Sequence, residues 1–247
     1  MNTADIMAVL LLSLLLLAVS LGTSMVFLLV RHARRRGFGN SKSQKPVAAV
    51  SLRRRSFVAR PTCWLAVRSR NPQAVQSALA LHHVKPCSWL QGLAGEAKLF
   101  VAPPVKGWIL VFGSGLPEPQ EDVDACYRFV VELSRRLGHV QLFSASRILH
   151  HHAWVRADSG RIIRAYAWAG RALWVQGQRT SAEKELGVAC LEYTDLPDEK
   201  FGLPDRIAAN VDKVPMLAAR WSLDPAAIDE RSLEHECGIA GEPSHRY

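Results

Sequence analysis

The sequence predicts an α+β protein in which a single N-terminal transmembrane helix precedes one domain with a mainly antiparallel sheet. An uncharged apolar run fills residues 6–30, and an arginine-rich segment follows it directly. Residues 61–222 then alternate short β-type segments with helical ones. Within them, residues 148–169 have the pattern of a β-hairpin.

The apolar run is long enough to cross a membrane. Its 25 residues contain no charged side chain, and as a helix they extend about 37 Å, against about 30 Å for the hydrocarbon core of a bilayer. A cleaved secretory signal is the alternative, but residues 1–5 contain no Lys or Arg and the run is longer than a signal needs. Because arginines flanking a span stay in the cytoplasm, we expect residues 1–5 outside and the C-terminal domain in the cytoplasm.

Positive charge is concentrated after this run. The net charge is +9, yet residues 31–95 hold 13 Lys and Arg and no Asp or Glu. Residues 31–60 also contain Gly, Ser and Pro, which predicts a flexible basic linker. Anionic headgroups attract each nearby Lys or Arg by about 1 kcal/mol, so we expect a lipid partner and no nucleic acid. The expected headgroup contacts are Arg31, Arg34, Arg35, Arg36, Arg53, Arg54 and Arg55. For the arginines at 31–36, the alternative is that they only determine the orientation of the span. For the arginines at 53–55, the alternative is an ordinary solvated linker.

The first half of the domain alternates strands and helices. Asn71 followed by Pro72 predicts the start of a helix that reaches about residue 81. Apolar periodicity predicts a longer helix from Val123 that Gly138 ends. The other expected elements are strands at 63–68, 98–102, 108–112 and 139–143 and a short helix at 88–93. This order is compatible with a ferredoxin-like split βαβ unit with an added hairpin, and equally with other α+β sheets.

The hairpin at residues 148–169 predicts the candidate binding face. Asp158, Ser159 and Gly160 suit a three-residue loop. If Ala157 pairs with Arg161, small residues gather on one face, above which Trp174 of a third strand at 171–176 fills the space. The other face then carries His150, His152, Trp154, Arg164, Tyr166 and Trp168.

This face has the composition of a binding surface. Aromatic residues beside arginine are typical of interfaces, so we expect a protein, peptide or small-ligand partner. Coverage by the next layer of the fold is the alternative. His150 and His152 point the same way on a strand, but no third ligand accompanies them, and we predict neither a metal nor a cofactor. We predict no catalytic residue, because the motifs that would supply one are incomplete.

The C-terminal part returns to helix. Thr180 and Glu183 have the spacing of a capping box. A strand is expected at residues 189–193, a helix after Asp212, and a further turn at Asp224. Residues 223–247 are acidic and are expected to be a frayed tail.

Four runs resemble those of uncharacterised bacterial proteins of unknown function, at residues 102–108, 151–154, 164–170 and 219–222. The resemblance covers the folded domain and not the membrane segment. It implies a bacterial source, hence the cell inner membrane, and transfers no catalytic residue. We therefore expect a membrane-tethered cytoplasmic binding or interaction module rather than an enzyme. The alternatives are a hydrolase-like enzyme using the His150/His152 face and sensing of anionic lipids through the basic linker.

Overall fold

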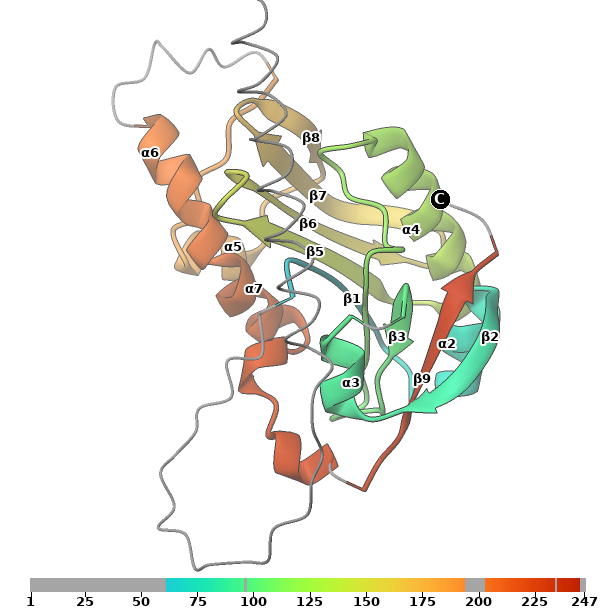
Figure 1. Cartoon of the computed structure of the whole chain (residues 1–247). Helices are drawn as coiled ribbons and strands as arrows, with labels where there is room; N and C mark the ends of the chain where they lie inside the picture. The colour runs from blue at the N-terminus through green and yellow to red at the C-terminus, as the bar shows by residue number, and fades with distance from the viewer. Residues whose placement is uncertain (1–60, 96, 194–202, 234, 245–247) are drawn as a thin grey trace, which may run out of the picture. The chain divides into compact units, whose positions relative to one another are not determined.

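The computed structural model of the chain describes residues 61–95, 97–193, 203–233 and 235–244 (Figure 1). Within these ranges the protein is an α+β domain built on one nine-stranded sheet, ordered β2-β9-β3-β4-β1-β5-β6-β7-β8. All neighbouring strands pair antiparallel. The predicted α+β class with a mainly antiparallel sheet is therefore confirmed. The chain divides into two units, Met1–Arg55 and Ser56–Tyr247, and all described residues belong to the second.

The elements include the expected strands and helices of the first half and also two strands that were not expected, β2 and β9. The strands are β1 (Cys63–Val67), β2 (Leu81–Cys87), β3 (Leu99–Val101), β4 (Ile109–Phe112), β5 (Val140–Ser146), β6 (His151–Asp158), β7 (Arg161–Ala169), β8 (Ala172–Gln176) and β9 (Gly238–Pro243). The helices are α2 (Pro72–Ala78), α3 (Trp89–Leu93), α4 (Val123–Leu137), α5 (Ser181–Glu185), α6 (Leu203–Ala208) and α7 (Val214–Trp221), with short 3-10 turns η2 (Ala209–Asp212), η3 (Pro225–Ala227) and η4 (Glu230–Leu233).

Two hydrophobic layers pack on opposite faces of the sheet, because side chains alternate along each strand. One face presents small and aliphatic residues such as Leu65, Ala153 and Ala165, and α2 and α4 cover it (Figure 1). Trp174 packs into this layer above the alanines, as predicted. The opposite face presents Trp154 and other aromatic residues, and the C-terminal helices cover it.

Side-chain caps explain where the helices begin. The Asn71 side chain accepts a hydrogen bond from the Ala74 amide at 3.1 Å, with Pro72 in the first turn, as predicted. The Thr180–Glu183 capping box is also confirmed. Asp122 caps α4 by accepting from the Ala125 amide at 2.9 Å. Each of these bonds satisfies an amide that the helix itself leaves without a partner.

The β6–β7 hairpin keeps its predicted faces through a different register. Its turn has two residues, Ser159 and Gly160, with φ of +50° and +81°, so Asp158 rather than Ala157 pairs with Arg161. The predicted three-residue loop is therefore wrong. A bulge after Arg156 then shifts the pairing by one further residue. The two shifts together amount to an even number of positions, which preserves the predicted sides of the sheet from Arg164 onward. Before the bulge, Ile162 rather than Ile163 packs against the small-residue layer.

Three other predictions in the domain are corrected. The first helix ends at Ala78 rather than near residue 81, because Ala80 adopts φ +48° and turns the chain into β2. Residues 189–193 form no strand, and the Ala189 amide instead donates to the Asn210 side chain at 3.1 Å. The C-terminal stretch 223–247 is not a frayed tail throughout, because it supplies β9, which pairs with both β2 and β3.

The membrane predictions fall outside the described part of the chain. Over the residues that the structure describes, the search for a helix both long and apolar enough to span a bilayer finds none. The predicted span at 6–30 and the linker at 31–60 precede those residues. So do the expected headgroup contacts Arg31, Arg34, Arg35, Arg36, Arg53, Arg54 and Arg55.

Candidate anion-binding site

The structure buries five of the six residues predicted as an open binding face. His152, Trp154, Arg164, Tyr166 and Trp168, here called the aromatic layer, are each at most 8% exposed. The sixth residue, His150, is exposed in the turn between β5 and β6, with φ +48°. The expectation that these side chains share one face of the sheet thus holds for the five, and the C-terminal helices pack over them.

Glu183 of α5 balances the positive charge of Arg164 in the aromatic layer. Its Oε1 accepts hydrogen bonds from Arg164 Nε and Trp154 Nε1, each at 2.9 Å, and its side chain is fully buried. The Arg164 Nη1 also donates to the carbonyls of Gln176 and Gly177, both at 3.2 Å. The charge of the guanidinium is therefore balanced by Glu183, and several of its N–H donors bind carbonyls inside the fold. A buried cation requires such a counter-charge and such hydrogen bonds to be tolerated.

His152 is held as a neutral ring. Its centroid lies 5.4 Å from that of Trp168 and 5.6 Å from that of Trp154, and the Asn210 amide lies 3.3 Å from its Nε2. Burial, followed by the nearby His151, lowers the pKa of His152 to about 3. With His150 turned away, the two histidines do not share a site, and the described residues contain no group of three metal-ligating side chains.

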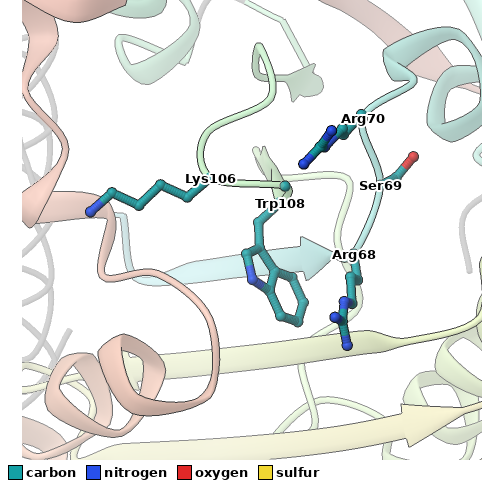
Figure 2. Close-up of a pocket in the computed structure, with 6 residues that line it drawn as sticks. Arg68, Ser69, Arg70, Lys106 and Trp108 are labelled. Carbon is teal, nitrogen blue, oxygen red and sulfur yellow. The ribbon is translucent and has the colours of Figure 1, made fainter.

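A second constellation, the basic pocket, opens at the end of β1. It is a hollow of about 520 Å³ lined by Arg68, Ser69, Arg70, Lys106, Gly107 and Trp108 (Figure 2). Val67, the last residue of β1, pairs there with Ile109 of β4 and Val140 of β5. One wall therefore follows β1 and the other precedes β4.

Local hydrogen bonds position both walls. The Arg68 amide donates to the His139 carbonyl at 3.0 Å, and the Asn71 amide donates to Ser69 Oγ at 3.1 Å before Asn71 caps α2. On the other wall, Val105 and Trp108 exchange both backbone hydrogen bonds, at 2.8 and 2.9 Å. Lys106 and Gly107 between them have φ of +51° and +82°, as in the two-residue turns that join tight hairpins.

The lining of the basic pocket carries three cations and no carboxylate. Over the described ranges, Arg68, Arg70 and Lys106 form no salt bridge, whereas Arg164 and several surface arginines do. Figure 2 shows the Arg70 guanidinium extending toward the Lys106–Trp108 turn, with the Trp108 ring between the arginines and Lys106. Guanidinium groups bind carboxylates and phosphates through paired N–H donors.

His139 adds a titratable group beside this pocket. Its ring meets that of Trp108 edge-on, with centroids 5.6 Å apart. Burial lowers the pKa of His139, and the positive charge of Arg156 lowers it further. Asp158 acts in the opposite direction, and Arg68 adds a smaller lowering. The surroundings of His139 are thus cationic even while its own ring is neutral.

This arrangement suits binding of an anion rather than chemistry on it. The one hydroxyl in the lining, that of Ser69, accepts a backbone hydrogen bond and has no base in the lining to activate it. The sequence did not predict the pocket. Arg68 and Arg70 were included only among the 13 Lys and Arg of residues 31–95. Two arginines at the end of the predicted strand 63–68 and just beyond it, and a Lys-Gly turn before the predicted strand 108–112, were the available signal.

Comparisons of the chain with protein-family models, with curated proteins and with solved structures found no match. The geometry of the basic pocket is therefore what supports a function.

Proposed function

We propose that this protein is a membrane-tethered binding module whose folded domain takes up a multiply charged anion in the basic pocket. The observation that carries the proposal is the set of three cations without a paired carboxylate around one hollow. Cations without a paired carboxylate around a concave surface create a positive potential that attracts anions. Phosphate and carboxylate groups are the chemistry that this donor set fits.

The tether is the second part of the proposal. The apolar run at 6–30 and the arginines after it support a single span, with the domain on the cytoplasmic side. Arginines of the basic linker would then meet anionic headgroups. The sequence of the linker supports this contact, and neutralising Arg53, Arg54 and Arg55 tests it by whether a spin label in the linker still loses mobility when phosphatidylglycerol is added to the vesicles.

We also propose that the centre of the sheet is a ferredoxin-like split βαβ unit. The supporting observation is the order β3-β4-β1-β5 with antiparallel neighbours. In that order, the connection through α4 leads from β4 to β5, with β1 between them. The connection from β1 to β3 runs through α2, the edge strand β2 and α3, and β4 lies between β1 and β3. This is the arrangement that two interleaved split βαβ units produce.

Binding of pyrophosphate to the full chain in detergent micelles, measured by isothermal titration calorimetry, tests the pocket. We expect binding that weakens by about tenfold or more in an Arg68→Ala/Arg70→Ala variant. The matched control is Arg128→Ala/Arg161→Ala, since both arginines are exposed and lie outside the pocket lining. Absence of binding by the unaltered chain, or equal loss in both variants, would contradict the proposal.

A second arm identifies the source of the anion. The chain is reconstituted into vesicles with and without phosphatidylglycerol, and pyrophosphate is titrated into both. Weaker pyrophosphate binding in the phosphatidylglycerol vesicles, where the headgroup competes for the pocket, assigns the pocket to a lipid headgroup. Equal pyrophosphate affinity in both kinds of vesicle assigns it to a soluble anion.

A further inference from the structure

We infer that the turn between β5 and β6, residues 147–150, rests on the surface of the lipid bilayer. Ile148 and Leu149 occupy its tip and are 90% and 68% exposed. These are the two highest exposures among the large apolar side chains of the described residues. Scattered single apolar residues on a surface need no explanation, but two adjacent ones at the tip of a turn form a contact element.

The base of the turn is fixed, so the two aliphatic side chains are held outward. The Leu149 amide donates to Ser146 Oγ at 3.2 Å, and Arg147 Nε donates to Asp212 Oδ1 at 2.6 Å. Asp212 belongs to η2, which packs against β5 and β6. A tip that is held in place loses little conformational entropy when it binds.

The position of the turn identifies the bilayer as its partner. The Ala145 amide, close to the turn, donates to the Thr62 carbonyl at 2.7 Å, and Thr62 lies where the chain from the linker enters the domain. A coil of 30 residues, the length of the proposed linker, has a root-mean-square end-to-end distance of about 30 Å, whereas a domain of this size is about 40 Å across. A tethered domain therefore presents its entry end to the membrane more readily than the far end. This step rests on the proposed membrane tether.

The chemistry of the turn fits an interface between headgroups and acyl chains. Two aliphatic side chains reach the acyl boundary, and the polar His150 and the Arg147–Asp212 pair flank them at the level of the headgroups. Of the carboxylates that face this region, Asp212 is paired with Arg147, and Glu118 lies 3.4 Å from Nε2 of His151. Both carboxylates thus accept a hydrogen bond within the domain, Asp212 from Arg147 and Glu118 from the Gln120 amide.

Spin labels on the full chain in vesicles of phosphatidylethanolamine and phosphatidylglycerol test the contact. The exposed Cys237 is first replaced by Ser, and Leu149→Cys is labelled. The matched control is Ile163→Cys, since Ile163 is 48% exposed and lies near the other end of the hairpin. We expect the label at position 149 to collide with oxygen more often, and with a water-soluble nickel chelate severalfold less often, than the label at position 163.

Each other outcome overturns the inference in a recognisable way. Equal nickel accessibility at both positions, in chains that float with the vesicles, rejects the contact and leaves the tether intact. Protection of position 149 from both reagents that grows with protein concentration assigns the turn to a second copy of the chain. Failure of the chain to float with vesicles rejects the tether, and the contact with it.

Discussion

Arginine occurs in two opposite settings in this domain. In the aromatic layer, Arg164 is 2% exposed and bound to the fully buried Glu183. In the basic pocket, Arg68 and Arg70 are exposed and have no carboxylate in the lining. The two settings also contain similar neighbours, since Tyr166 lies beside Arg164 and Trp108 lies in the pocket.

The difference shows what distinguishes a structural arginine from one available for binding. Both belong to the pattern of arginine among aromatic residues that is typical of interfaces. Arg164 has its counter-charge on α5, which packs over the sheet, and so its donors are used within the fold. Arg68 and Arg70 have no such counter-charge in the pocket lining, so their N–H donors remain available to a ligand. The position of the counter-charge, rather than the composition, separates the two.

The largest expected effect is that of removing the buried counter-charge. Glu183→Ala leaves Arg164 buried without its carboxylate and Trp154 without its acceptor. Loss of one partner of a buried pair costs about 3–5 kcal/mol of the free energy of unfolding, which urea denaturation of the full chain in detergent would measure. The control is Glu185→Ala, which removes the surface ion pair between Glu185 and Arg220. Loss of this pair should lower the free energy of unfolding by less than about 1 kcal/mol. Equal effects would mean that the aromatic layer does not depend on Glu183.

Acid should destabilise the aromatic layer through His152. Its pKa is lowered from 6.5 to about 3 in the folded chain, so the unfolded chain takes up a proton that the folded chain does not. The free energy of unfolding should therefore decrease as the pH falls below 6.5, with a limiting slope of about 1.4 kcal/mol per pH unit from this group. Denaturation between pH 7 and pH 5 measures the slope.

A variant separates His152 from other titrating groups. His152→Gln should reduce the slope, while His83→Asn should leave it unchanged. His83 is exposed and has φ +50°, a conformation that Asn tolerates. If the slope survives in His152→Gln, another group is responsible.

The features that the sequence predicted correctly depend on contacts between residues that lie close together in the chain. Asn71 with Pro72, and Thr180 with Glu183, were recognisable because a cap and its partner lie three residues apart. β2 and β9 were missed because each contains Pro, and their pairing joins residues such as Leu81 and Pro243 that are far apart in the chain. The burial of Arg164 beside Glu183, and the meeting of residues 68–70 with residues 106–108 in one pocket lining, depend on such distant contacts too, so neither site was predictable from the sequence.

The pocket arginines should matter for binding and hardly at all for stability. Arg68→Ala/Arg70→Ala removes no described salt bridge, so the free energy of unfolding should change by less than about 1 kcal/mol. Pyrophosphate affinity of the unaltered chain should decrease with added salt, and that dependence should be weaker in the variant because screening acts on exposed charges. A destabilisation as large as that of Glu183→Ala would place these arginines with Arg164 as structural residues.

The smallest expected effect comes from His139. Because burial, and then Arg156, lower its pKa below 6.5, the ring becomes a further cation beside Trp108 only in mild acid. Sulfate, whose charge is constant between pH 7 and pH 5, should then bind about two- to fivefold more tightly at the lower pH. His139→Gln should remove this gain and leave the affinity at pH 7 unchanged, as measured by calorimetry. A gain that persists in His139→Gln would have to come from outside this ring, and the basic pocket would then recognise its anion through permanent charges alone.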